Sequence, residues 1–282
     1  MQKFLKWTGF VVAGIAGVVL LGMAWVYFAS ARELGREFTA HDDTPLVIPT
    51  DAEGIAAGKR VAQLAGCMHC HGDKLEGGLV DDIPNLVRLV APNISVVLPK
   101  YSDAQIATVL RTGVKPDGRS VMFMPSEMYR HLADEDLGRL IAFLRTVPVT
   151  TEGVKEATDV RIIGRVLLAT GQFKPAAAGI PALPAAVRTF DANDIVSRGR
   201  HLTMSFCSEC HGQALEGFEP IQAPPLTVAK GYSPAQFAHL LHDGVPPGNR
   251  ELKLMGPTSK ARFANFTDDE VSAIFTFLQS RS

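Results

Sequence analysis

The sequence predicts an all-α protein in which two helical units follow an N-terminal membrane-spanning helix. Three observations predict this architecture. The N-terminus contains 25 consecutive residues without a charged side chain, which is long enough to cross a bilayer as a helix. Further along the chain, apolar residues recur with the period of amphipathic helices and follow helix-capping motifs. One order of elements also occurs twice, with an offset of 140 residues, which indicates a tandem duplication.

The charge-free run covers residues 7–31, and two lysines precede it. Positive charge before a span and balanced charge after it place the N-terminus in the cytoplasm. We therefore expect residues 1–31 to form an uncleaved membrane anchor. The alternative is a cleaved signal peptide, because Ala29-Ser30-Ala31 resembles a cleavage site. The apolar core of a signal peptide is usually about 7–15 residues long, which is shorter than this run.

Two short motifs contain all four cysteines of the chain, Cys67-Met68-His69-Cys70-His71 and Cys207-Ser208-Glu209-Cys210-His211. This is the attachment spacing of c-type haem. Two thiolates separated by two residues match the two vinyl groups of the haem, and the next histidine becomes the proximal iron ligand. The motifs therefore predict two covalent haem c groups, linked through Cys67, Cys70, Cys207 and Cys210 and ligated by His71 and His211.

A zinc site and a redox-active dithiol are the competing interpretations of these motifs. A zinc site would bring a second ligand pair within about 12–20 residues, whereas the two cysteine pairs are 140 residues apart. A thioredoxin-type dithiol follows a strand pattern, whereas a helical pattern precedes both motifs. Because no cysteine remains outside the motifs, we expect neither a disulfide nor a catalytic thiol.

The first helical unit is predicted over residues 53–147. Its first helix is expected from about Ala52 to Gly66 and its last from Asp134 to Thr146, each with an apolar face. A capping box of the form Ser-x-x-Gln begins at Ser102 and predicts a third helix between them. The stretch from Gly72 to Pro99 is expected to be a loop.

Two segments of irregular composition flank the first unit. Residues 32–52 are polar, contain two prolines and predict an extended tether. Residues 148–192 are rich in Ala, Pro and Thr and predict a partly ordered connector with one helical piece from Val160 to Thr170. The second unit, residues 193–282, repeats the order of the first, including a capping box that begins at Ser233.

Residues 51–148 and 193–282 each resemble the class I cytochrome c family, and the whole chain resembles the membrane-anchored dihaem cytochromes of bacterial periplasms. Besides the two cysteine motifs, the resemblance rests on Ala91-Pro92-Asn93-Ile94, Ala223-Pro224-Pro225-Leu226, Met124-Pro125-Ser126 and the acidic caps of the last helices.

The resemblance implies a small helical bundle around one haem in each unit. The first and last helices of such a bundle cross at a glycine, here Gly58 and Gly199. The backbone carbonyls of Pro92 and Pro224 would accept a hydrogen bond from the proximal histidines, which fixes the tautomer of a ligating histidine.

Methionine is the expected sixth ligand of both irons, with a core-filling role as the alternative. In the second unit, Met255 is the only methionine after the motif, although the following Gly-Pro-Thr-Ser-Lys departs from the common Met-Pro pattern of the family. In the first unit, Met124 directly before Pro125 fits that pattern best, and Met122 and Met128 are alternatives. Three histidines are further alternatives that we expect at the surface or rim, His131, His239 and His242.

Two irons closed by histidine and methionine favour electron transfer without substrate chemistry. No nucleophile–base, dinucleotide or phosphate-loop pattern is present in the sequence. The formal net charge of −1 gives no reason to expect nucleic acid as a partner.

We therefore expect a periplasmic electron-transfer protein of the bacterial inner membrane. Its donor would be a periplasmic dehydrogenase or a quinol-oxidising complex, and its acceptor a small cytochrome or a terminal oxidase. One alternative is the cytochrome c subunit of a membrane-bound periplasmic dehydrogenase complex. The other is a dihaem peroxidase, which would need an open or displaceable position on one iron.

Overall fold

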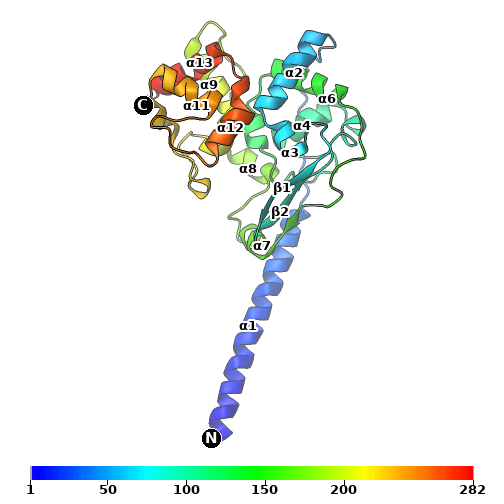
Figure 1. Ribbon diagram of the computed structural model, residues 1–282. Coiled ribbons are helices and arrows are strands. Elements are labelled where there is room, and N and C mark those ends of the chain that lie inside the picture. Colours follow the sequence, from blue (N-terminus) through cyan, green and yellow to red (C-terminus); the bar gives the residue numbers. More distant parts are fainter. Residues whose placement is uncertain (1, 282) are drawn as a thin grey trace.

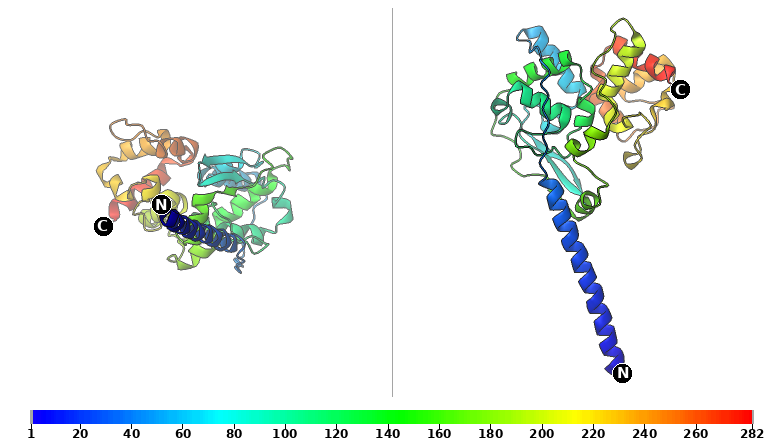
Figure 2. Two further views of the ribbon diagram at one scale, coloured as in Figure 1. Left: turned by 90° about the horizontal axis from the view of Figure 1, so that it is seen from below. Right: turned by 180° about the vertical axis from the view of Figure 1, so that it is seen from behind.

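The computed structural model describes residues 2–281; residues 1 and 282, the ends of the predicted anchor and second unit, lie outside the described residues. A single long helix, α1 (Gln2–Leu34), projects from a body of two helical lobes (Figure 1). The lobes lie side by side, and α1 leaves the body beneath the first lobe (Figure 2). Helices predominate in the body, which confirms the predicted fold class.

The first lobe is built on two helices that cross closely, α2 (Ala52–Leu64) and α6 (Asp134–Thr146). A Cβ atom at Gly58 of α2 would lie 1.8 Å from the carbonyl oxygen of Arg139 in α6, so only glycine permits this contact. The predicted capping box is present, because Ser102 Oγ accepts from Gln105 N–H while the Gln105 side chain accepts from Ser102 N–H. The helical elements of the lobe are α2 (Ala52–Leu64), α3 (Cys67–His71), η1 (Leu98–Lys100), α4 (Asp103–Thr112), α5 (Ser126–Tyr129) and α6 (Asp134–Thr146).

The second lobe repeats this construction. Helices α9 (Ile195–Phe206) and α13 (Asp268–Ser280) cross at Gly199, where a Cβ atom would lie 1.9 Å from the carbonyl oxygen of Ala273. Ser233 and Thr267 each begin a complete capping box, at α11 and α13. The elements of the lobe are α9 (Ile195–Phe206), α10 (Ser208–His211), η3 (Glu219–Ile221), η4 (Leu226–Gly231), α11 (Pro234–Asp243), α12 (Met255–Ala261), η5 (Phe263–Asn265) and α13 (Asp268–Ser280).

The segment from Gly72 to Pro99, expected to be a loop, contains an antiparallel hairpin. Strands β1 (Gly78–Ile83) and β2 (Val87–Ala91) pair with each other, and β3 (Asp159–Val160) pairs with β2 from the connector. The register shifts between Leu79 and Asp81, which breaks the regular alternation that identifies a strand in a sequence.

The connector between the lobes is folded against the first lobe. It contains α7 (Ile162–Ala169), α8 (Ala176–Gly179) and η2 (Ile180–Ala182). At its start, Asn93 Nδ2 donates to Thr150 O over 2.7 Å, and near its end Arg130 Nη2 donates to Pro184 O over 2.8 Å. The segment before α2 is also tied down, because the buried Arg111 forms an ion pair with Asp42 at 3.1 Å.

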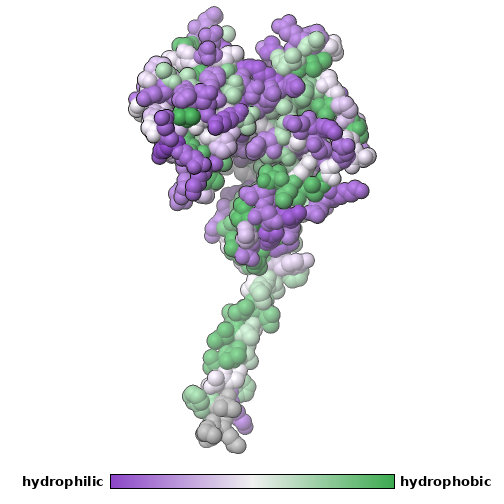
Figure 3. All heavy atoms as spheres, viewed as in Figure 1, coloured by the Kyte–Doolittle hydropathy of each residue, from purple (hydrophilic) through white to green (hydrophobic). Residues whose placement is uncertain are grey.

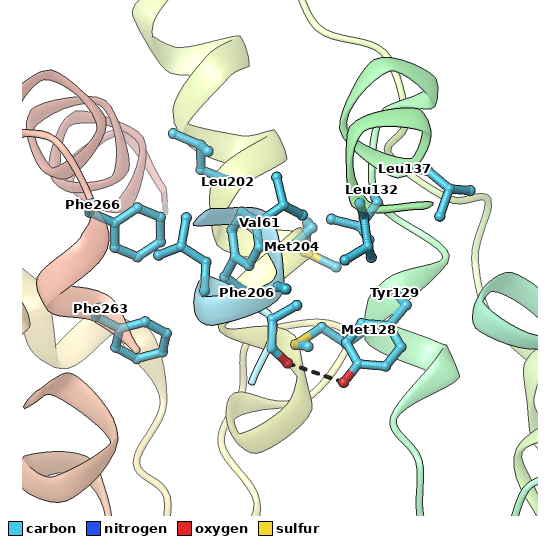
Figure 4. Packing of buried hydrophobic residues seen from close by; sticks show 14 of the residues in the cluster. Val61, Met128, Tyr129, Leu132, Leu137, Leu202, Met204, Phe206, Phe263 and Phe266 are labelled. Atoms are coloured by element: carbon cyan, nitrogen blue, oxygen red, sulfur yellow. Dashed lines mark hydrogen bonds between the residues drawn. The ribbon is translucent and has the colours of Figure 1, made fainter. Parts of the chain in front are cut away.

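The two lobes share one hydrophobic core. Leu132, Met128 and Val61 of the first lobe pack in the same cluster as Phe206 and Phe266 of the second (Figure 4). A large apolar interface opposes relative motion of the two parts that it joins. The lobes therefore hold a defined position relative to each other.

Candidate functional site

The first cysteine motif forms a single helical turn, α3, directly after α2. Gly66 precedes it with φ of 76°, a left-handed conformation that glycine adopts without strain. This turn lets the chain start a new helix at Cys67. Cys67 and Cys70 are three residues apart and thus lie on the same face of the turn. In the second motif, Ser208–His211 likewise form a turn of helix, α10, and Cys207 is its N-cap.

Both motif histidines bond to the proline carbonyls that the resemblance implies. His71 Nδ1 lies 2.9 Å from Pro92 O, and His211 Nδ1 lies 2.8 Å from Pro224 O. A carbonyl accepts only, so Nδ1 carries the proton in both rings. This tautomer leaves the lone pair of Nε2 free, as a metal ligand requires.

A close approach of two loops places each proline carbonyl. A Cβ atom at Gly77 would lie 2.5 Å from Ala91 O, and one at Gly217 would lie 2.6 Å from Ala223 O. The same glycines donate to the motif histidines, with Gly77 N 2.7 Å from His71 O and Gly217 N 2.9 Å from His211 O. The two motifs therefore have matching surroundings.

The protonation of the motif residues follows from burial. Desolvation lowers the pKa of His71 and of His211, while their proline hydrogen bonds act in the opposite direction. Both imidazoles are thus kept in the neutral form that binds iron. Desolvation also raises the pKa of Cys67 and of Cys207 to about 12. Since the thiolate is the reactive form of cysteine, thioether formation is expected before the chain reaches this folded state.

These features fit a covalently held haem at a motif. The four cysteines form no disulfide, so each motif presents two free thiols. Each motif also presents one histidine whose Nε2 is free to bind a metal. Apolar residues of the core pack against the motifs. Within residues 2–281, no three His, Cys, Asp or Glu side chains gather as a metal cluster, which disfavours a zinc site built from these cysteines.

The candidate methionines occupy different environments. Met255 is the first residue of α12, and Met255 and Met124 are both partly buried against the core. Met122 instead lines an apolar cleft between the hairpin and α7. Met128 is fully buried, with its Sδ 3.9 Å from Arg262 Nη2 at the contact between the lobes. This geometry retains Met255 and Met124 as the candidate ligands.

Two of the histidine alternatives, His131 and His239, are bonded elsewhere, whereas the partly buried His242 lies with its Nε2 3.5 Å from Asp268 Oδ1 and forms no hydrogen bond through that atom within the described residues. His131, expected at the surface or rim, is instead buried between the lobes, with 2% of its surface exposed. Its Nδ1 accepts from Val187 N–H at 2.8 Å, and its Nε2 therefore donates to Gln213 Oε1 at 2.9 Å. Both ring nitrogens are used, so His131 is unsuited to bind iron. His239 is exposed and bonds to Asp243 at 2.6 Å.

Arg262 joins the two motifs, and nothing in the sequence singled it out. This side chain of the second lobe is buried. Its Nε donates to Leu64 O at 2.9 Å, three residues before Cys67, and its Nη1 bonds to Glu209 Oε2 at 2.9 Å, inside the second motif. Its charge lowers the pKa of Cys67 and of Cys207 against the dominant effect of burial. One guanidinium therefore lies within electrostatic range of both motifs.

A second contact crosses the interface beside the motifs. Gln213, two residues after His211, donates through Nε2 to Glu127 O at 3.1 Å in addition to its bond with His131. These contacts join residues 82 and 86 positions apart in the chain. Contacts between residues so far apart produce neither a periodic pattern nor a motif spacing in the sequence. The sequence alone therefore did not predict the interface between the lobes.

Comparison with known proteins agrees with the geometry of the motifs. The chain is 26% identical over 277 residues to the fructose dehydrogenase cytochrome subunit of Gluconobacter japonicus. The match covers 87% of this chain and 56% of the relative, so the chain spans little more than half of that protein's length. The family model for cytochrome c matches residues 55–148 and 196–282. Because these matches contain both cysteine motifs and both proline carbonyls, the chain belongs to the cytochrome c family.

Proposed function

We propose that this chain is a membrane-anchored electron-transfer protein of the bacterial periplasm that holds two haem c groups, one at each motif. The observation that carries the proposal is the pairing of two matching motifs across a packed interface bridged by Arg262. Each haem, when bound, holds or releases one electron as its iron changes between the ferrous and ferric states. Arg262 and the shared core keep the two motifs at a constant separation, which a two-site electron relay requires.

The side chains of each motif have separate roles in this proposal. Cys67 and Cys70 hold the first haem, and Cys207 and Cys210 hold the second. His71 and His211 bind iron through Nε2, while the proline carbonyls hold their rings in place. Met124 and Met255 would supply the sixth ligands, which would raise the reduction potential and exclude small-molecule substrates from the iron.

We propose further that α1 is retained as an anchor. Its last turns contact α7, because Arg165 Nη1 donates to Ser30 Oγ at 3.2 Å and the Arg165 guanidinium lies 5.3 Å from the Tyr27 ring centroid. Cleavage after residue 31 would remove these contacts. With its lysine-flanked end in the cytoplasm, α1 confines the body to the periplasmic surface of the inner membrane and raises its encounter rate with membrane-bound partners.

The reaction to test is electron transfer without substrate turnover. The full chain, purified in detergent and chemically reduced, is expected to show low-spin haem spectra at neutral pH. Mixed with an oxidised small cytochrome c in a stopped-flow instrument, it should be reoxidised without any other substrate. Peroxide-dependent turnover or a high-spin haem at neutral pH would contradict the carrier function and support the dihaem peroxidase.

A second candidate function is the cytochrome subunit of a periplasmic dehydrogenase complex, favoured by the name of the Gluconobacter japonicus relative. In that case the same motifs would accept electrons from a tightly bound catalytic subunit. Affinity purification of the full chain from mildly solubilised membranes separates the two functions. A dehydrogenase recovered at equal stoichiometry would identify a subunit, whereas recovery of the chain alone would support a carrier with exchangeable donors and acceptors.

A further inference from the structure

The exposed face of α7 is an apolar surface beside the point where α1 enters the body. Ile162, Ile163 and Val166 are 52%, 48% and 37% exposed. The opposite face of the helix, with Gly164 and Leu168, is buried. Figure 3 shows hydrophobic residues along α1 and, on the body, in the region of α7 and the hairpin, whereas polar residues cover most of both lobes. An exposed apolar face of this kind marks an interaction surface.

The contacts of α7 with α1 fix its depth relative to the membrane. Arg165 bonds to Ser30 and stacks on Tyr27, and both residues belong to the final turns of the charge-free run, which ends at residue 31. If α1 spans the bilayer, these turns lie at the boundary between acyl chains and headgroups. The residues of α7 therefore lie at the same boundary.

The hairpin holds α7 rigidly in this position. Ile163 N–H donates to Asn85 O at 2.8 Å, and Arg161 N–H donates to Leu86 O at 3.1 Å. A Cβ atom at Gly164 would lie 2.5 Å from Leu86 O, so the helix and the hairpin are in direct backbone contact. The orientation of the apolar face is thus set by the folded body.

We propose that α7 lies in the interface of the membrane that α1 crosses, with Ile162, Ile163 and Val166 inserted among the lipids. The partner of this surface is the lipid bilayer, because the contacts of α7 with the last turns of α1 hold the surface at the boundary of the lipid. Arg165 places a cation beside the apolar face, as is typical of interfacial helices next to lipid phosphates, whereas Arg161 is paired with Asp82 of the hairpin at 2.6 Å. The proposal rests on the proposed retention of α1.

Two-point attachment would fix the orientation of the body on the membrane. A single helix leaves a body free to rotate and tilt about its tether. A second contact through α7 removes this freedom and sets both motifs at a constant height above the bilayer. Partners in the same membrane would then meet the same face of the protein at every encounter.

Site-directed spin labelling of the full chain in lipid nanodiscs tests the proposal. All four native cysteines are consumed by haem attachment in the proposed holoprotein, so a single introduced cysteine is the unique labelling site. The test variant is Ile163→Cys. The matched control is Ile195→Cys, at the start of α9, because Ile195 is also an exposed isoleucine (46%) and α9 lies far from α1 (Figure 1). A third variant, Val18→Cys in the middle of α1, reports on insertion of the anchor.

The measurement is the accessibility of each label to oxygen, which concentrates in lipid, and to a water-soluble nickel complex. The Ile163→Cys label is expected to be shielded from nickel and accessible to oxygen, while the Ile195→Cys label stays accessible to nickel. A water-exposed label at residue 163 together with a lipid-exposed label at residue 18 would overturn the α7 proposal and leave the anchor intact. If the label at residue 18 is exposed to water, or is absent because the N-terminal segment has been cleaved off, the proposal that α1 is a retained membrane anchor would be overturned. Val166→Cys repeats the test, and unchanged haem spectra show that each labelled variant is folded.

Discussion

Met255 and Met124 are the residues on which the proposed coordination depends. Met255→Ala and Met124→Ala should each remove about half of the absorption band that arises from charge transfer between methionine sulfur and ferric iron, because each haem would lose one axial thioether. Spectra of the oxidised variants check this. Met122→Ala and Met128→Ala serve as controls and should retain the full band. Loss of the band in either control would assign the first-lobe ligand to that residue instead of Met124.

Arg262 is the residue that couples the two motifs electrostatically. Arg262→Gln should lower the reduction potentials of both haems, because the lost cation no longer favours the reduced irons. It should also reduce the free energy of unfolding by about 2 kcal/mol, since Glu209 keeps its charge without its partner. A potentiometric titration with a denaturation curve measures both effects.

Two matched variants separate the charge of Arg262 from its packing. Arg262→Lys keeps the cation and should retain most of the potential while losing part of the stability. Arg88→Gln removes a half-buried arginine of the hairpin, which pairs with the exposed Glu156, and should leave both potentials close to wild type. A change in Arg262→Gln no larger than in Arg88→Gln would show that Arg262 has no electrostatic role at the motifs.

At the scale of the element, the helix crossings depend on two glycines. Gly58→Ala and Gly199→Ala should each lower the free energy of unfolding by about 3 kcal/mol, because the added Cβ forces the crossing helices apart. Thermal denaturation checks this. Gly179→Ala is the control, since no atom lies within 4 Å of its Cβ position and its φ is −86°. Equal melting temperatures for Gly58→Ala and Gly179→Ala would contradict the close crossing.

The interface between the lobes contains a pH-sensitive element at His131. Burial, together with the nearby guanidinium groups of Arg130 and Arg188, lowers the pKa of His131 to about 4 from 6.5, and the bond to Gln213 offsets part of this effect. Between these two pH values the unfolded chain binds a proton that the folded chain does not. The contribution of His131 to stability is therefore complete above pH 6.5 and falls by about 3 kcal/mol as the pH drops to 4.

Denaturation curves between pH 4 and 7 check the behaviour of His131. The variant His131→Gln keeps a side chain able to bond to Gln213 but removes the titrating group. Its stability should fall less steeply with acid than that of the wild type, the difference between the two proteins being the measured quantity. Parallel curves would show that His131 does not govern the acid response.

At the scale of the whole molecule, local patterns predicted the parts better than their assembly. The cysteine motifs, the capping boxes at Ser102 and Ser233 and the crossing glycine Gly58 depend on neighbouring residues or on the resemblance to a family, and the structure contains them as expected. The hairpin was missed because its register shifts between Leu79 and Asp81.

The assembly of the lobes depends on contacts between distant parts of the chain. Arg262 bonds to Leu64 across 198 positions, and His131 bonds to Gln213 across 82. In the sequence, Arg262 and His131 resemble ordinary surface residues, because charged and polar side chains are mostly exposed. Arg262 and His131 are buried because the apolar residues of the two lobes pack into one shared cluster and enclose these side chains between the lobes.

The central claim is that each motif holds a haem, so that one chain forms a two-site relay. The mass of the intact chain, purified from membranes after expression with a haem-attachment system and denatured to remove any non-covalent ligand, tests this claim most directly. Our account predicts the mass of the polypeptide with α1 retained plus two haems, falling to one haem in either Cys67→Ala/Cys70→Ala or Cys207→Ala/Cys210→Ala. A wild-type chain that carries one haem, or none, would contradict it.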